Sequence, residues 1–230
     1  MNGILLVDKP QGWTSFDAVH KVRQLIQHSS LNETGKKRFP VGHTGTLDPM
    51  ATGLLVLLLG TYTKKAMGLT KLDKIYEVTM YLGKTSTTGD EEGEKTKVST
   101  RQPDRPAVEK ALESFIGDSL QKPPIYSAIK INGQRAYKLA RAGKTVELEP
   151  RPVHITSITL TGYEYPLVRF TAHVSSGTYI RSLVEDLGTL LQTGAYMSAL
   201  RRVGVGQFNI EDAISADHLD LEMIQRHTFD

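Results

Sequence analysis

The stretch VGHTGTLDPMATGLLVLLLG, residues 41–60, joins a glycine-rich half to an apolar half. Its glycines and the Asp48-Pro49 pair predict a loop without a regular repeat. The run from Leu54 to Leu59 is apolar throughout and ends at Gly60, which predicts a buried strand. We therefore expect the loop to hold its side chains rigidly at the end of a sheet, where functional groups gain from preorganisation.

Asp48 has two interpretations at this stage. An aspartate before a proline often caps its own turn, and for an isolated Asp-Pro pair we favour that structural role. In a loop that holds it rigidly, the same carboxylate can instead serve as a nucleophile. The remainder of the sequence has to decide between the two.

The residues before this stretch predict a strand followed by a helix. Gly3 to Val7 is a short apolar run that ends in a turn at Asp8-Lys9-Pro10. Ser15 is expected to be the helix N-cap, and Asp17 lies where it complements the helix dipole. The helix has one apolar stripe, formed by Phe16, Val19, Val22, Leu25 and Ile26. Residues 28–38 are polar and are expected to form an exposed loop.

The residues after it predict strands interrupted by helices. Alternation predicts strands over 76–82, 153–163 and 167–174, and helices are expected over 106–115 and 180–191. Residues 83–95 are polar and are expected to form a mobile loop. We find no repeat or linker, so we expect a single domain over 1–230. The pattern favours a mixed α/β (α+β) fold with a central, largely antiparallel sheet flanked by helices.

Composition narrows the class of protein. The 230 residues are 39% hydrophobic and 23% charged, which is typical of a globular chain. Since there is no cysteine, disulfides, thiol nucleophiles and thiolate zinc sites are excluded. There is no signal peptide or long apolar segment, so a cytoplasmic location and no membrane contact are expected. The net charge of +3 permits RNA binding without establishing it.

The run from Gly42 to Gly53 resembles the catalytic motif of the bacterial tRNA pseudouridine-55 synthase family, also called the pseudouridine synthase B family. The family pattern is Gly-His-Thr-Gly-x-Leu-Asp-Pro-x-Ala-Thr-Gly, and every fixed position is matched here. The resemblance implies the pseudouridine synthase catalytic fold and conversion of uridine to pseudouridine in structured RNA, at uridine 55 in the T-arm of tRNA. It implies that Asp48 is the nucleophile and that His43 lies against the RNA. On its own, such a histidine would be an ordinary surface residue.

Further motifs occur in the family's order over about residues 3–218. Residues 5–15 resemble the N-terminal motif, in which Lys9-Pro10 is expected to be structural. Residues 73–93 resemble the second motif, which implies that Tyr76 stacks on the target base, although Tyr76 could also be the first core residue of its strand. Residues 175–188 and 196–208 resemble the last two motifs. They imply active-site roles for Tyr179 and Arg181 and a uracil pocket lined by Leu200, which could otherwise be a core residue.

Two features of the sequence have more than one interpretation. Asp90 lies at an acidic family position, but a lone acid in a polar loop is usually solvated, so it has no assigned role. Residues 123–143 also resemble a family stretch, and they contain a basic cluster interleaved with tyrosines: Lys130, Arg135, Lys138 and Arg141, with Tyr126 and Tyr137. This cluster suits a phosphate backbone, and a solvated basic helix explains it equally well.

The implied chemistry fits these residue types. The reaction breaks the bond between ribose C1′ and uracil N1 and joins C1′ to C5, so we expect neither a cofactor nor a metal. Arg181 beside Asp48 would favour the ionised carboxylate and orient it through a bidentate contact. The base must leave its stack before reaction, and stacking on Tyr76 would offset part of that cost. Asp48, Arg181 and Tyr76 are thus the expected catalytic residues, and His43, Tyr76, Tyr179 and Leu200 the expected substrate-binding residues.

The chain departs from the pattern at its C-terminal end. Most bacterial members carry a further small RNA-binding domain there, and the chain ends at Asp230 without room for one, so weaker RNA affinity is expected. The expected partner is RNA, foremost tRNA, for a monomer without an obligate protein partner. The alternatives are the same chemistry at another uridine or in a guide-RNA complex, a non-catalytic RNA-binding module, and a hydrolase of small nucleosides.

Overall fold

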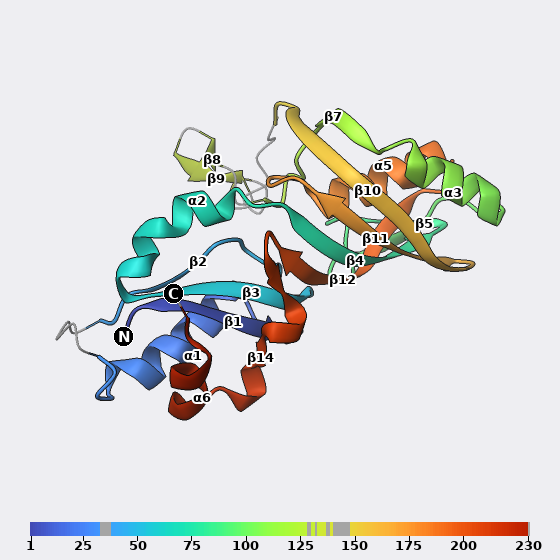
Figure 1. The fold of residues 1–230 in the computed structure, drawn as a ribbon. Helices are drawn as coiled ribbons and strands as arrows, with labels where there is room; N and C mark the ends of the chain where they lie inside the picture. The colour runs from blue at the N-terminus through green and yellow to red at the C-terminus, as the bar shows by residue number, and fades with distance from the viewer. Residues whose placement is uncertain (33–37, 128–129, 132, 137–138, 140–147, 230) are drawn as a thin grey trace. The chain divides into compact units, whose positions relative to one another are not determined.

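The structure is a computed structural model that describes residues 1–32, 38–127, 130–131, 133–136, 139 and 148–229 (Figure 1). It is a mixed α/β protein with helices and a large, mostly antiparallel sheet, so the predicted fold class is confirmed. The chain forms two compact units: unit 1 is Met1–Glu77 with Leu200–Asp230, and unit 2 is Val78–Ala199. No linker separates them, because strands β4 (Lys74–Leu82) and β12 (Ala195–Val205) each have residues in both units.

Unit 1 is built around strand β3, which lies between other strands. Antiparallel β1 runs along one side from Gly3↔Leu59 to Lys9↔Gly53, and β14 pairs with β1 in parallel. On the other side, β2 is antiparallel and the end of β12 is parallel, with Arg202 opposite Gly53. The elements of unit 1 besides the ends of β4 and β12 are β1 (Gly3–Lys9), α1 (Ser15–Gln27), β2 (Val41–His43), β3 (Thr52–Leu59), a 3-10 helix (Gly60–Lys65), α2 (Ala66–Thr70), β13 (Phe208–Asn209), a 3-10 helix (Ile210–Asp212), β14 (Ile214–Ser215), a 3-10 helix (Ala216–His218) and α6 (Leu221–His227).

The predicted buried strand is confirmed, because every residue from Leu54 to Leu59 is at most 1% exposed. Its alternate side chains enter two apolar clusters, one on each face. Leu55, Leu57 and Leu59 pack with α1 and α6, which Figure 1 shows against β1 and β3. The even-numbered side chains 54, 56 and 58 pack with α2 and the preceding 3-10 helix. The strand is thus covered on both faces, which explains its unbroken apolar sequence.

The predicted N-cap of α1 is wrong by one residue. Thr14 caps the helix, since its side chain accepts from the Asp17 backbone N–H and the Asp17 carboxylate accepts from the Thr14 backbone N–H. Such a reciprocal pair is a capping box. Ser15 is the first helical residue, and its hydroxyl bonds instead to the backbone of Leu47, 32 residues away. The apolar stripe is also narrower than predicted, because Phe16 is 56% exposed.

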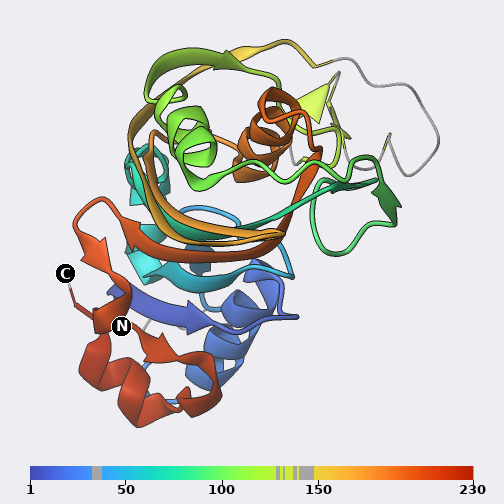
Figure 2. The same cartoon turned by 90° about the vertical axis from the view of Figure 1, so that its right-hand side faces the viewer.

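Unit 2 places helices against one face of its strands. In the sheet, β4, β11, β10 and β7 are neighbours in that order, and the β10–β11 and β10–β7 pairs are antiparallel. Figure 2 shows α3 and α5 side by side on the same face of these strands. The elements of unit 2 besides the ends of β4 and β12 are β5 (Lys84–Ser86), β6 (Lys95–Lys97), α3 (Arg105–Glu113), β7 (Gly117–Gln121), β8 (Lys130–Ile131), β9 (Gln134–Arg135), β10 (Arg151–Glu164), β11 (Leu167–Val174) and α5 (Ile180–Leu190).

The stretch expected to be a mobile loop carries a β-hairpin. Strands β5 and β6 pair from Lys84↔Lys97 to Ser86↔Lys95. Asp90, between them, is 3% exposed and forms a bridge with Met197 of β12. The mobile-loop prediction is wrong because several of these polar residues hydrogen-bond to one another and to the buried Asp90. Of the predicted basic cluster, Tyr137, Lys138 and Arg141 lie outside the described residues.

No helix in the described part of the chain is long and apolar enough to cross a membrane.

Candidate active site

The loop between β2 and β3 holds Asp48 in a fixed backbone position. Leu47 on one side exchanges two hydrogen bonds with the Ser15 hydroxyl, at 2.8 and 3.2 Å. The carbonyl of Pro49 on the other side accepts from the Gly12 N–H at 2.8 Å. The Asp48 carbonyl accepts from the Ala51 N–H at 3.1 Å, which closes the turn. The backbone is therefore tied to the α1 region on both sides of Asp48, whose side chain is half-buried.

Lys9 supports the same loop from the end of β1. It is fully buried, and its Nζ donates to the carbonyls of Pro10 at 2.9 Å, Trp13 at 2.7 Å and Pro49 at 3.5 Å. Burial lowers its pKa to about 8, and the nearby Asp48 carboxylate opposes that shift. Lys9 thus fits the structural role expected of it and brings a positive charge close to Asp48.

Arg202 joins the Asp48 loop to β3. Its side chain is 2% exposed, Nε donates to the Leu54 carbonyl at 2.7 Å, and Nη2 donates to the Gly45 carbonyl at 3.1 Å. Beside it, Gly53 has a φ of +102°, and a Cβ there would lie 2.2 Å from the Arg202 carbonyl oxygen. Only glycine can occupy that position without displacing the strand. The adjacent Arg201 forms a bidentate ion pair with Asp8, at 2.7 and 3.1 Å.

His43 ends β2, next to the same loop. Its Nδ1 accepts from the Gly45 N–H at 3.3 Å, which assigns the ring proton of the neutral form to Nε2. Burial first, and the positive charge of Arg202 second, lower the pKa of His43 below the ordinary value. His43 is therefore neutral near pH 7 and presents an N–H donor at Nε2.

Tyr76 and Leu200 complete the predicted residues of unit 1. Tyr76 is 9% exposed and shares its face of β4 with the buried Val78, Met80 and Leu82. Its burial agrees with a core residue, and stacking on a base stays a prediction. Leu200 is half-buried and directly precedes the two arginines of β12.

In unit 2, Arg181 near the start of α5 is buried and held by several acceptors. Its Nη1 donates to the Thr88 carbonyl at 3.3 Å and lies 3.7 Å from Asp90 Oδ2, and Nη2 donates to the Tyr126 carbonyl at 2.9 Å. The other carboxylate oxygen of Asp90 accepts from the Thr88 hydroxyl and from the Glu92 N–H. The tip of the β5–β6 hairpin is thus organised around the Arg181–Asp90 pair.

Tyr179, just before α5, is held through its backbone. The amide of Gln121 accepts from the Tyr179 N–H at 2.8 Å and donates to the Tyr179 carbonyl at 3.0 Å. One turn further along α5, burial raises the pKa of Glu185, and the charge of Arg181 opposes that shift. The start of α5 therefore presents Tyr179 and Arg181 from a fixed backbone.

Two family models match the chain in succession. One, described as TruB family pseudouridylate synthase (N terminal domain), matches residues 33–180, and the other, described as tRNA pseudouridylate synthase B C-terminal domain, matches residues 181–229. The chain belongs to the TruB family of pseudouridylate synthases. It is therefore an enzyme of the isomerase class, and the resemblance drawn from its motifs is confirmed.

Curated members of the TruB family are similar over nearly the whole chain. The tRNA pseudouridine synthase B of Burkholderia mallei (strain NCTC 10247) is 45% identical over 220 residues, which are 96% of this chain and 70% of that protein. The protein of the same name from Solibacter usitatus (strain Ellin6076) is 42% identical over 221 residues, 96% of this chain and 72% of that one.

Solved structures share the TruB-family fold. A chain of a Cbf5-Nop10-Gar1 complex superposes with a TM-score of 0.71 at 27% identity. A chain of an H/ACA RNP bound to a substrate RNA containing 2′-deoxyuridine superposes with a TM-score of 0.68 at 25% sequence identity. Each alignment covers 94% of this chain but only 54% and 52% of the solved chains, so this protein spans about half their length.

The predicted site residues of this TruB-family protein fall into two groups. His43, Asp48, Tyr76 and Leu200 belong to unit 1, whereas Tyr179 and Arg181 belong to unit 2. The predicted pairing of Asp48 with Arg181 joins residues of different units and stays a prediction. The absence of a cofactor and of a further RNA-binding domain, and the single-domain organisation, also stay predictions.

Five supporting residues are not indicated, or only partly indicated, by local sequence patterns. Asp90 stands at an acidic family position, which is a signal, but a lone acid in a polar stretch does not indicate the burial that the structure shows. The double arginine at 201–202 directly follows Leu200, but nothing in the local sequence marks either arginine as part of a site. No local pattern marks Gln121 or Ser15 as a partner, because each bonds to a backbone far away in sequence.

Proposed function

We propose that the protein converts uridine 55 in the T-arm of tRNA to pseudouridine, with the Asp48 carboxylate as nucleophile. The observation that carries this proposal is the fixing of the Asp48 backbone on both sides, by Ser15 at Leu47 and by Gly12 and Lys9 at Pro49. An aspartate that only capped its own turn would not need these contacts from β1 and α1. The names of the curated relatives support tRNA as the substrate.

The held carboxylate suits each route open to this isomerisation. It can add to C6 of the base, attack C1′ of the ribose, or remove a proton from the ribose. In every case the bond from C1′ to N1 breaks, the bond from C1′ to C5 forms, the C5 proton is lost, and a proton is gained at N1. A rigid backbone helps because it keeps the carboxylate in a reactive position without a further entropic cost.

The other predicted residues receive roles that fit their surroundings. His43, neutral and with its proton on Nε2, donates a hydrogen bond to the RNA at the place left by the extruded base. Tyr76 stacks on the target uracil, Leu200 lines its pocket, and Tyr179 packs on its other side. Arg181 favours the ionised form of Asp48 and orients it, because a guanidinium offers paired donors to a carboxylate. Its other contacts, to Asp90 and two carbonyls, hold the guanidinium in one orientation.

Mapping the product by position tests the proposal. The protein is incubated with an unmodified tRNA transcript and with a matched transcript that has cytidine at position 55. We expect pseudouridine at position 55 of the first transcript and none in the second. If the same amount formed at another position in both transcripts, the chemistry would stand and the target would be wrong.

A non-catalytic RNA-binding module, the alternative from a different class, does not agree with membership of the TruB family of synthases. It would bind both transcripts and form no pseudouridine in either. We favour the enzyme because binding alone requires neither a held carboxylate nor a buried arginine at the positions that match the family motifs. We further propose that the protein acts as a monomer in the cytoplasm, which sedimentation of the purified protein and cell fractionation would test.

A further inference from the structure

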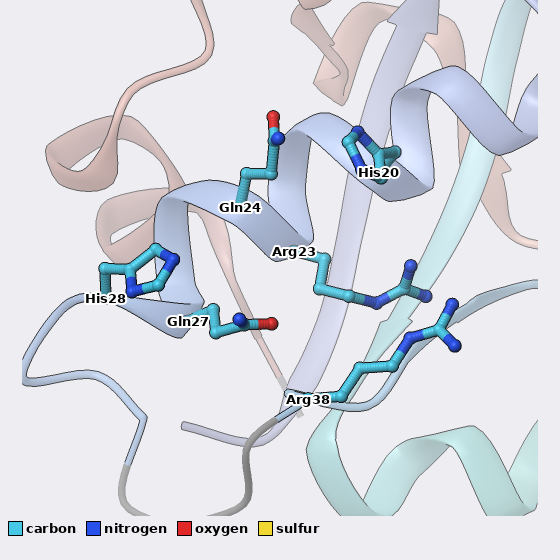
Figure 3. A pocket seen from close by; sticks show the side chains of 6 residues that line it. All are labelled: His20, Arg23, Gln24, Gln27, His28 and Arg38. Atoms are coloured by element: carbon cyan, nitrogen blue, oxygen red, sulfur yellow. The ribbon is translucent and has the colours of Figure 1, made fainter.

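A basic cavity lies on α1 in unit 1, beside the segment that enters β2. Its volume is about 390 Å³. Figure 3 shows that five of its lining residues come from α1 and its C-cap and that Arg38 reaches it from the segment before β2. The described lining residues include no carboxylate: they are His20, Arg23, Gln24, Gln27, His28 and Arg38. Two guanidinium groups among amide and imidazole side chains make this cavity a candidate site for an anion.

Arg23 lines this cavity, and its guanidinium group is only partly hydrogen-bonded within the described residues. It is 8% exposed, and it donates from Nε to the Phe39 carbonyl at 3.2 Å and from Nη2 to the Val41 carbonyl at 2.9 Å. Its Nη1 is shielded from solvent and has no hydrogen-bond partner among the described residues. A buried donor without an acceptor costs free energy, and buried cations are normally paired.

A second cation lies beside it. Figure 3 shows the guanidinium groups of Arg23 and Arg38 next to each other in the cavity. Burial lowers the pKa of Arg23, and the charge of Arg38 lowers it further. Arg38 is exposed, so its side chain can turn aside and open a path to Nη1 of Arg23. The two like charges repel each other, and an anion bound between them would remove that repulsion.

We propose that this cavity is a binding site for a phosphate group, clamped between the guanidinium groups of Arg23 and Arg38. The planar fork of guanidinium donors matches the oxygens of a phosphate, and two such forks can contact different oxygens of one group. Among the other lining residues, Gln27 points toward the two arginines in Figure 3, and its amide can supply a further donor. The phosphate can belong to a small molecule or to the backbone of the RNA substrate, and the chemistry of recognition is the same.

Thermal unfolding of the full chain in inorganic phosphate tests the site without reference to catalysis. The melting temperature is measured against phosphate concentration and against sodium chloride at equal ionic strength. Two variants address the cavity: Arg38→Gln removes one arm of the clamp, and Gln27→Glu places a carboxylate beside the arginines. Arg226→Gln is the matched control, since it makes the same change at an exposed position on α6.

We expect a saturable, phosphate-specific rise in melting temperature for the wild type and for Arg226→Gln. That rise should disappear in Arg38→Gln and Gln27→Glu. Gln27→Glu should also melt above the wild type when phosphate is absent, because its carboxylate replaces the anion. An equal response to phosphate in all four proteins would overturn the proposal.

The source of the phosphate is decided by the salt dependence of tRNA binding, an arm that rests on the proposed function. If the cavity takes a backbone phosphate, Arg38→Gln should reduce the slope of log affinity against log salt by about one, whereas Arg226→Gln should not. In the other case, Arg38→Gln loses the phosphate-dependent rise in melting temperature while its salt-dependence slope for tRNA binding equals that of Arg226→Gln. That result assigns the site to a small phosphate compound. Failure of the proposed function would instead show as the absence of pseudouridine in the wild type, with the phosphate response intact.

Discussion

Lys9 and Arg202 are long charged side chains that are almost fully buried, and both support the Asp48 loop. Lysine and arginine are by default exposed, so their sequence positions gave no reason to expect burial. Each donates its hydrogen bonds to main-chain carbonyl groups. Lys9 donates to Pro10, Trp13 and Pro49, and Arg202 donates to Gly45 and Leu54. The loop is therefore fixed by charged donors that bind its backbone rather than by apolar contacts alone.

The burial of Lys9 predicts a pH-dependent contribution to stability. Its pKa is lowered from 10.5 to about 8 in the folded protein. Between these values the unfolded chain binds the proton and the folded chain does not, so the free energy of unfolding rises with pH. In Lys9→Met that rise is absent. The free energy of unfolding of the wild type minus that of Lys9→Met should thus increase from about pH 8 to pH 10.5, by at most about 1.4 kcal/mol per pH unit.

Denaturant unfolding at several pH values measures this difference. Lys71→Met, at an exposed position of unit 1, corrects for the general effect of a lysine-to-methionine change. A difference that stays constant or shrinks as the pH rises would contradict the assigned burial of the Lys9 ammonium group.

Arg181→Lys tests the proposed partner of Asp48. Lysine keeps the charge but has no fork of donors, so the contacts to Thr88 and Tyr126 cannot both be kept in the same geometry. We expect single-turnover pseudouridine formation to fall on the order of 100-fold. Affinity for tRNA, measured by filter binding, should change little. Near-normal turnover would remove Arg181 from its proposed role.

At the scale of elements, the start of β3 depends on Gly53. Its positive φ disfavours any other residue, and a Cβ would meet the Arg202 carbonyl at 2.2 Å. We expect Gly53→Ala to lower the free energy of unfolding by at least about 2 kcal/mol. Gly12→Ala is the control, because Gly12 also has a positive φ, at +86°, but has open space around it. Chemical denaturation should find the control less destabilised, and equal losses would contradict the close approach of Gly53 and Arg202.

The β5–β6 hairpin leads to a second prediction at this scale. Asp90→Asn removes the buried negative charge that faces Arg181 and keeps the side chain's size. We expect kcat to fall about tenfold or more with KM little changed, because a misplaced guanidinium affects the reaction rather than binding. Glu92→Gln removes a charge from the same hairpin at an exposed position and serves as the control. Equal kcat values for Asp90→Asn and Glu92→Gln would show that the hairpin does not position Arg181.

Most elements could be predicted because their signals are local. The apolar run of β3, the alternation in β4 and β11 and the helical spacing of α5 all depend on residues close in sequence. The errors occurred where a distant contact decided the structure. The N-cap of α1 is Thr14 rather than Ser15, because the Ser15 hydroxyl binds the backbone of Leu47. The stretch expected to be a mobile loop carries a hairpin, because Asp90 pairs with Arg181 of α5.

At the scale of the whole molecule, the sequence contains no sign of the division into two units. The boundary falls within β4 and β12, which are continuous strands, so no change of composition marks it. The predicted site residues are divided between the units, with Asp48 in one and Arg181 in the other. The resemblance to the family's motifs could assign Asp48 and Arg181 to one reaction. It compares short stretches of sequence with motifs of known function, so it does not require knowledge of the two units.

The central claim is that the Asp48 carboxylate carries out the reaction. Single-turnover formation of pseudouridine at position 55 of a tRNA transcript is measured for the wild type, for Asp48→Asn and for Asp212→Asn, which makes the same change at an exposed position of unit 1. Melting temperature and tRNA affinity are measured for all three proteins. We predict that Asp48→Asn folds and binds tRNA like the other two but forms no pseudouridine, and appreciable turnover by Asp48→Asn would contradict the claim.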